Sequence, residues 1–475
     1  FYDGFARRNS VTDNLGRVVK TFFDSAGRKQ YVVENYLSGD GYWTNAPHLG
    51  PADGIEGRDA DVNRVTKTTY TPLGRTATLV AIDPNHDGNT SDDQTTTYTY
   101  SDGSSSDCPV PRKDILVKIK YPDGDDTDDN VKQTYYANGL LKTRTDQRGV
   151  VHTYDFDDAS RLLADRVTDY PTTGAAADVF DDSVLAITYA YNSRGEREYV
   201  TSHSDDTPDT SSWTDATNQL KFTHDGLGRL TKSEQHHTAA VGQGTPAVEY
   251  AYAAASGGIF VDGGRLARVK YPNGRYVHYT YGSADTFADR LSRVDAIKND
   301  NGSGSPGTTT YAGYTYLGLP VRGAGTIVKV SHPAVTGGLN LTYGTGGTYA
   351  GLDRFGRVID QKWENDTPTV KDRFQYTYDR GSNRTSRDLS LTTGLDEKYT
   401  YDDLDRLTAA DRGTLSGGSI TSKQFAQDWT LSQTGNWTGF KLDADGDGFD
   451  DDDGDLTQSR THNGVNELTA VGETH

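Results

Sequence analysis

The stretch HDGLGRLTKSE, residues 224–234, predicts a tight turn that joins two β-strands. The carboxylate of Asp225 can accept a hydrogen bond from the backbone two residues further on. Gly228 supplies the positive φ that closes a hairpin loop, and Leu230 begins the returning strand. We expect Asp225 and Arg229 to hold the turn rather than to perform chemistry, because an exposed ion pair contributes only about 0.2–1 kcal/mol and gains its value through repetition.

The same turn recurs along the chain, in twelve units altogether. The other close copies occupy residues 13–17, 24–28, 71–75, 192–195, 353–357 and 432–435, and looser copies occupy 136–139, 157–160, 379–382, 402–405 and 463–466. The closing position holds glycine in eight units and Asp405, Asn466, Ser160 or Ser382 in the others. Because Gly, Asn and Asp tolerate the left-handed region, ten of the twelve units obey one backbone constraint. We expect hairpin ends with positive φ at Gly16, Gly27, Gly74, Gly195, Gly228 and Gly356.

An aromatic residue usually precedes the turn. The positions are Phe23, Tyr70, Tyr135, Phe156, Tyr191, Tyr378 and Tyr401. Alternating patterns such as Tyr376-Thr377-Tyr378 place both tyrosines on one face of a strand. The repeating unit is therefore strand, tight turn, strand, which predicts an all-β protein of antiparallel hairpins.

Several of these phrases resemble the tyrosine-aspartate (YD) repeats of Rhs and teneurin-type proteins. They are YTYDRGSNRTSRD (376–388), YTYDDLDRLTAAD (399–411), YDFDDASRLLADR (154–166) and HDGLGRLTKSE. The resemblance extends from residue 13 to residue 468. It implies a long spiralling antiparallel sheet that closes into a hollow shell or barrel, which in bacterial members encloses a C-terminal toxin domain.

The composition agrees with a shell and disfavours several other classes of protein. Hydrophobic residues make up only 33%, mean hydropathy is −0.73 and net charge is −20, yet the chain has 30 Tyr, 14 Phe and 5 Trp. A single-layer sheet needs less Leu and Ile than a compact globule, and amphipathic aromatics can cover its faces through cross-strand pairs. The acidic charge disfavours nucleic acid as a partner, and no apolar run is long enough for a membrane-spanning helix.

We expect one continuous YD-repeat array over residues 1–475. Residues 233–350 are expected to be degenerate repeats with long loops, because clear copies of the turn are missing there. Since the chain begins with Phe1 and contains no Met, we expect a fragment of a longer protein. The insertion at 203–217, rich in Ser, Thr and Asp, is expected to be a surface loop.

Two acidic stretches resemble calcium-binding loops. Within residues 443–455, Asp443, Asp445, Asp447 and Asp451 stand at positions 1, 3, 5 and 9 of an EF-hand-like frame, with Gly448 at position 6. Position 12 is Gly454, so the bidentate glutamate is absent. A weaker frame is formed by Asp83, Asn85 and Asp87. The alternative at both places is a solvated acidic hairpin tip.

No motif of a nucleophile elbow, zinc site, phosphate-binding loop or dinucleotide fold occurs in the sequence. The leading hypothesis is a non-enzymatic shell wall of a secreted or cell-surface protein, with its own C-terminal cargo or neighbouring subunits as partners. A second hypothesis is an extracellular adhesive or filament-forming protein that binds glycans or its own copies. A third is a carbohydrate-active enzyme, which would need two facing carboxylates in an aromatic-lined cleft.

Overall fold

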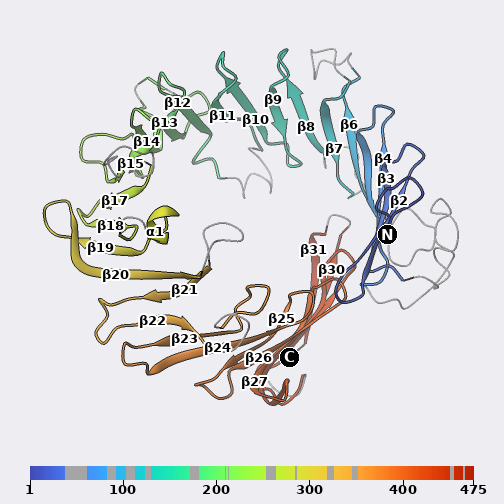
Figure 1. The fold of residues 1–475 in the computed structure, drawn as a ribbon. Helices are drawn as coiled ribbons and strands as arrows, with labels where there is room; N and C mark the ends of the chain where they lie inside the picture. Colours follow the sequence, from blue (N-terminus) through green and yellow to red (C-terminus); the bar gives the residue numbers. More distant parts are fainter. Residues whose placement is uncertain are drawn as a thin grey trace. The chain divides into compact units, whose positions relative to one another are not determined.

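A computed structural model of the chain shows antiparallel β-strands almost throughout (Figure 1). Strands account for 55% of the chain and helix for 1%. The structure describes residues 1–37, 61–82, 93–102, 113–122, 130–171, 181–208, 210–211, 213–252, 264–283, 286–317, 326–344, 351–449, 454–463 and 466–474. The predicted all-β class and the predicted antiparallel hairpin sheet are confirmed.

The chain divides into two compact units. The first comprises Phe1–Gly139 together with Phe374–His475, and the second comprises Leu140–Arg373. The boundary between them falls inside strand β24 (Val370–Tyr378).

The first unit contains strands from both ends of the chain. Its N-terminal strands are β1 (Ser10–Thr12), β2 (Val18–Phe23), β3 (Lys29–Glu34), β4 (Arg64–Tyr70), β5 (Thr76–Ala81), β6 (Gln94–Tyr100), β7 (Leu116–Lys120) and β8 (Asn130–Tyr135). Its C-terminal strands after β24 are β25 (Arg384–Leu389), β26 (Asp396–Tyr401), β27 (Leu407–Ser416), β28 (Ser419–Leu431), β29 (Trp437–Asp443), β30 (Leu456–His462) and β31 (Leu468–Thr474). Within each series, every strand pairs antiparallel with the next strand in sequence.

The second unit continues the same pattern. Its strands are β9 (Leu141–Thr145), β10 (Val151–Phe156), β11 (Leu162–Asp169), β12 (Ala186–Tyr191), β13 (Arg197–His203), β14 (Ala216–His224), β15 (Leu230–His236), β16 (Ala247–Tyr252), β17 (Leu266–Lys270), β18 (Tyr276–Thr280), β19 (Ala296–Asp300), β20 (Pro306–Leu317), β21 (Thr326–Ser331), β22 (Asn340–Tyr343) and β23 (Asp360–Glu364). A single turn of helix, α1 (Phe287–Arg290), lies between β18 and β19. Consecutive strands again pair antiparallel.

The residue before most repeat turns lies at a shift in strand register. In the β14–β15 hairpin, Thr223 faces Lys232 but His224 faces Leu230, so one residue of β15 is passed over. The same shift precedes Phe23, Tyr70, Tyr100, Phe156, Tyr191, Tyr252, Tyr378 and Tyr401. Such a bulge increases the local twist and changes the direction of the side chain at the shift.

Little of the sheet is deeply buried. In the first unit one apolar cluster contains Tyr31, Val33 and Val65, with Phe22, Tyr36 and Ile82 packed against it. Several of the largest fully buried side chains are polar, including His203, Gln219 and Asp443. Stability must therefore come mainly from the strand ladders and from cross-strand side-chain pairs.

Within the first unit the N-terminal strands contact the C-terminal repeat turns. Arg17 Nη2 lies 2.8 Å from Asp405 Oδ2, and Arg17 Nη1 donates to the carbonyl of Asp403 at 3.0 Å. Further along, the Gln94 amide donates to Asn466 Oδ1 at 3.1 Å. Segments far apart in sequence are therefore joined by side chains of the turns. In the described part of the chain, no helix is long and apolar enough to cross a membrane.

Candidate functional site

The carboxylate of Asp225 organises the turn between β14 and β15. Its Oδ1 accepts hydrogen bonds from the backbone N–H of Leu227 at 2.8 Å and of Arg229 at 3.0 Å. Its Oδ2 accepts from Arg229 Nε at 2.7 Å. The backbone closes the turn, because Asp225 N–H donates to the Arg229 carbonyl and Gly228 N–H donates to the Asp225 carbonyl. The predicted contact between Asp225 and Arg229 is thus present.

Among the residues that the structure describes, seven turns carry this aspartate-arginine pair at a spacing of four residues. The pairs are Asp3–Arg7, Asp13–Arg17, Asp24–Arg28, Asp157–Arg161, Asp225–Arg229, Asp353–Arg357 and Asp402–Arg406. All twelve closing residues have positive φ, including the two serines, Ser160 at 62° and Ser382 at 78°. The backbone constraint predicted from the sequence is therefore obeyed in every unit, even where the residue type does not favour it.

In three of these turns the arginine also contacts a tyrosine of the next hairpin. The guanidinium of Arg28 lies 4.4 Å from the ring centre of Tyr70, and Arg161 over Tyr191 and Arg229 over Tyr252 have the same spacing. The tyrosine hydroxyl then donates to the carbonyl of the residue after the arginine. Tyr70 bonds Lys29 at 2.6 Å, Tyr191 bonds Leu162 at 2.9 Å and Tyr252 bonds Leu230 at 3.0 Å. Aromatic, aspartate and arginine therefore form one link between successive hairpins.

The pKa values of the turn carboxylates agree with a structural role. The side-chain hydrogen bond from Arg229 lowers the pKa of Asp225, and the N–H groups of Arg229 and Leu227 lower it further. For Asp157 and Asp24, the backbone N–H of Arg161 or Arg28 is the first cause of a lowered pKa. A carboxylate held ionised by three donors is a poor general acid or base near neutral pH.

Some turns reach the same geometry with other residues. In the turn after β12, Asn192 Oδ1 accepts from the N–H groups of Arg194 and Glu196, and its amide donates to Glu196 Oε2 at 2.7 Å. Asn463 and Glu467 repeat this exchange after β30. The sequence contains a signal for these turns. Where asparagine replaces the first aspartate of the unit, a glutamate replaces the arginine at the fifth position.

Among the described residues, three further turns of this kind lie outside the twelve units identified in the sequence. They start at Asp3, Asp146 and Tyr271, and each shows both backbone hydrogen bonds of the repeat turn. Their fourth residues are Ala6, Gly149 and Gly274, all with positive φ. The turn at Tyr271 lies in the stretch expected to hold degenerate repeats.

The acidic loop after β29 brings three of the predicted calcium ligands together. Carboxylate oxygens of Asp443, Asp445 and Asp447 all lie within 4.8 Å of one another. Asp443 is 1% exposed and accepts from Gly446 N–H at 2.5 Å, whereas Asp445 and Asp447 are exposed. Asp455, also 1% exposed, accepts from Ala444 N–H at 3.0 Å and was not among the predicted ligands.

The other predicted metal ligands lie outside the described residues. These are Asp451 of the first frame and Asp83, Asn85 and Asp87 of the weaker frame. Their part in calcium binding stays a prediction.

The fold matches solved structures that contain TcdB2-TccC3. The crystal structure of TcdB2-TccC3-TEV superimposes with a TM-score of 0.56 at 12% sequence identity, covering 98% of this chain and 22% of that chain. A structure of the Photorhabdus luminescens Tc holotoxin pore gives a TM-score of 0.55 at 12% identity, with 98% and 22% covered. No family model and no curated protein matches the sequence.

These matches define the class of fold. The chain spans about a fifth of the length of the solved structures that it matches. It folds as an antiparallel sheet of YD-repeat hairpins, so the resemblance seen in the sequence is confirmed at the level of the fold.

Proposed function

We propose that this chain is a non-enzymatic wall of a YD-repeat shell that encloses and protects a polypeptide cargo. The observation that carries the proposal is the link between hairpins, in which aspartate, arginine and tyrosine side chains such as Asp225, Arg229 and Tyr252 hold successive hairpins together. Side chains committed in this way build an extended scaffold of any length.

The similarity to a Tc holotoxin pore supports the choice of cargo. We infer that the cargo is a toxin-type C-terminal domain of the same polypeptide, and that the protein is secreted or displayed on the cell surface. Neighbouring subunits are the other expected partners. The excess of acidic residues gives the scaffold a strong net charge of −20, which keeps such a protein soluble outside the cell.

Protection from protease tests the proposal. The full native polypeptide would be treated with a protease, and the fate of the segment after residue 475 followed by mass spectrometry. We expect that segment to survive until the repeat sheet unfolds. Cleavage as fast as that of the same segment expressed alone would contradict the proposal.

A matched pair of variants shows whether the wall itself gives the protection. The double variant Asp225→Ala/Arg229→Ala removes one turn clamp and should speed cleavage of the cargo. Asp158→Ala, an exposed carboxylate next to the clamp of another turn, should leave the rate unchanged.

We also propose that the acidic loop binds calcium. Three carboxylates with oxygens within 4.8 Å repel one another unless a cation lies among them, and carboxylate oxygens are the ligands that calcium prefers. Asp443, Asp445 and Asp447 would hold the ion together with Asp451. The missing twelfth ligand places the expected dissociation constant in the weak extracellular range, roughly 10⁻⁴–10⁻³ M.

Calorimetric titration of chelator-treated protein with calcium tests this second proposal. We expect a saturable heat in the unmodified chain that disappears in Asp445→Ala and persists in Asp158→Ala. If the unmodified chain shows no heat of binding, the loop is a solvated acidic tip.

A further inference from the structure

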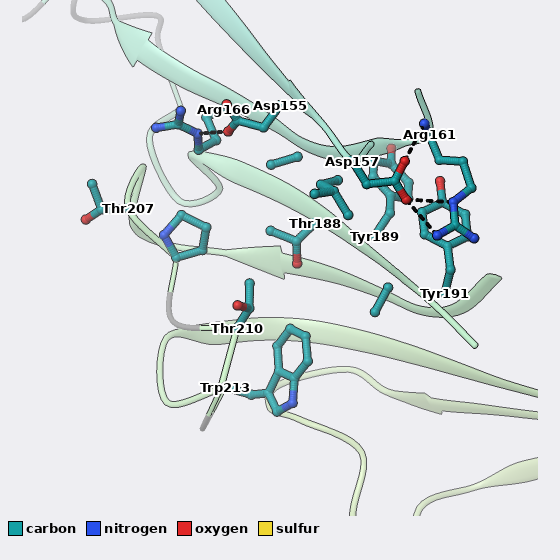
Figure 2. A pocket seen from close by; sticks show the side chains of 14 residues that line it. Asp155, Asp157, Arg161, Arg166, Thr188, Tyr189, Tyr191, Thr207, Thr210 and Trp213 are labelled. Atoms are coloured by element: carbon teal, nitrogen blue, oxygen red, sulfur yellow. Dashed lines mark hydrogen bonds and ion pairs between the residues drawn. The ribbon is translucent and has the colours of Figure 1, made fainter. Parts of the chain in front are cut away.

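A cavity of about 730 Å³ lies on the sheet of the second unit, and one of the turn clamps, Asp157 with Arg161, forms part of its lining (Figure 2). Its lining comes from β10, β11 and β12 and from the segment between β13 and β14. This volume falls within the range of roughly 300–1,000 Å³ that is usual for small-molecule sites. The segment that covers one side belongs to the insertion expected from sequence to be a surface loop.

Trp213 forms one wall of the cavity and is held in an unusual conformation. Its φ is +56°, in the left-handed region that a bulky residue rarely adopts. Its indole stacks on His203 with ring centres 5.9 Å apart and on Tyr199 at 5.8 Å. Backbone strain of this kind persists only where surrounding contacts impose it, and it is concentrated at functional sites.

Complete burial and one hydrogen bond fix the histidine beneath the indole. His203 is fully buried, with Nε2 2.8 Å from the hydroxyl of Thr188 and Nδ1 3.1 Å from Asp215 Oδ1. The ring of His203 therefore cannot rotate freely, and it presents a flat support to Trp213. Figure 2 shows Trp213 beside Thr210, with Thr188 above them in this view.

The charged groups that line the cavity are balanced in number. Asp155 Oδ2 lies 2.8 Å from Arg166 Nε, and Asp157 is clamped by Arg161 as in the other repeat turns. Arg166 also donates to the Asp206 carbonyl at 3.3 Å. A charged ligand would bring an unmatched charge into this setting, so an uncharged ligand is favoured.

We propose that this cavity binds a neutral pyranose sugar. A pyranose has an apolar face of C–H groups, which suits the indole of Trp213, and hydroxyl groups around its edge. The paired carboxylate and guanidinium of Asp155 and Arg166 offer acceptors and donors side by side for neighbouring hydroxyls. Thr207 and Thr210 add hydroxyl groups from the covering segment. This inference is independent of the shell proposal, since it is argued from Trp213, Asp155 and Arg166 and not from the turn clamps.

Calorimetric titration with the methyl pyranosides of glucose, galactose, mannose and N-acetylglucosamine tests the inference. We expect saturable binding of at least one of them, weakened about tenfold or more in Trp213→Ala, since an aromatic anchor typically dominates such a site. Trp363→Phe serves as the control in the same unit, because Trp363 stacks on His332 and does not line the cavity. That variant should bind as the unmodified chain does.

Two milder variants keep the test decisive if Trp213→Ala does not fold. Asp155→Asn and Thr210→Val each alter one polar group, and each should weaken binding severalfold. The proposal is overturned if none of the four pyranosides binds, or if all folded cavity variants bind with unchanged affinity. Binding of N-acetyltyrosinamide in the absence of pyranoside binding would also overturn it, because the cavity would then be a peptide site.

Discussion

The turn after β14 and the loop after β29 are built from the same residue types, aspartate and glycine, and behave differently. In the turn, the carboxylate of Asp225 is surrounded by two backbone N–H groups and the guanidinium of Arg229. In the loop, carboxylate oxygens of Asp443, Asp445 and Asp447 lie within 4.8 Å of one another. The difference is the arginine four residues after the aspartate.

That difference separates structure from candidate ion chemistry. In a turn that contains both aspartate and arginine, the carboxylate is neutralised within the turn, and repeated turns of this kind form the sheet. A loop that brings several carboxylates together needs a bound cation to neutralise their repulsion. Sequence patterns rich in Asp and Gly should therefore be sorted by whether a cationic residue occupies the fifth position.

The largest loss of stability is expected from alanine substitutions at one glycine of the turn and one glycine of the loop. Gly228 and Gly446 both have positive φ, 79° and 93°. A Cβ at Gly228 would meet only the end of the Glu196 side chain at 2.8 Å, whereas at Gly446 it would meet backbone atoms of Lys423 at 2.4 Å. We expect Gly228→Ala to cost about 1–2 kcal/mol from the left-handed strain, and Gly446→Ala to cost about 1–3 kcal/mol more, because the backbone of β28 cannot yield.

Hydrogen exchange of the β14–β15 and β28–β29 amides measures these free energies of opening. Gly226→Ala is the control, because a Cβ there has nothing within 4 Å and the substitution should stay within about 0.5 kcal/mol. Equal destabilisation by Gly228→Ala and Gly446→Ala would contradict the close approach of the Lys423 backbone to Gly446.

Acid should weaken the turn clamps in a defined window. The folded-state pKa of Asp225 is lowered, first by the Arg229 side chain, so the stabilisation is present above the unfolded value of about 3.9 and is lost as pH falls through the lower folded value. The thermal midpoint should therefore be flat near neutral pH and fall in acid. Asp225→Asn should flatten the acid dependence of the β14–β15 hairpin, since Asn192 shows that an amide can hold such a turn. An unchanged dependence in this variant would mean that other groups cause the acid response.

Loss of one tyrosine hydroxyl should have a smaller effect. Tyr252→Phe removes the bond to the Leu230 carbonyl while keeping the ring under Arg229, so we expect a cost of about 0.5–1.5 kcal/mol to the β15–β16 pairing. Tyr191→Phe should have the same effect at its own hairpin, where the acceptor is the Leu162 carbonyl. If both variants exchange their amides as the unmodified chain does, the hydroxyl bonds do not contribute to the link.

Local turn chemistry could be predicted from the sequence because it depends on residues four apart. Positive φ at the closing position and the Asp225–Arg229 contact follow from short-range backbone sterics and hydrogen bonding. The turns at Asp3, Asp146 and Tyr271 do not fit the twelve units because their first, fourth or fifth residues depart from the common pattern. The turn at Asp3 has Ala6 at its closing position, and the turn at Asp146 has no arginine at its fifth position. The turn at Tyr271 has no aspartate or asparagine at its first position to accept backbone hydrogen bonds.

The contacts between hairpins could not be predicted in this way. Arg229, just before β15, reaches Tyr252 at the end of the neighbouring strand β16, and the number of residues between such partners varies from unit to unit. The burial of His203 and the stacking of Trp213 likewise depend on how the segment after β13 folds back on the sheet. Composition marks that segment as a loop, whereas the structure makes it the wall of a cavity.

Arginine and tyrosine of successive hairpins act as one link, and a double-mutant cycle tests this coupling directly. The free energy of opening of the β14–β15 and β15–β16 pairings would be measured by hydrogen exchange in Arg229→Ala, Tyr252→Leu and the double variant. We predict a coupling of about 0.5–1 kcal/mol, because the ring loses its value as a partner once the guanidinium is gone. Effects that add to within about 0.3 kcal/mol would show that the two residues act independently and would contradict the link.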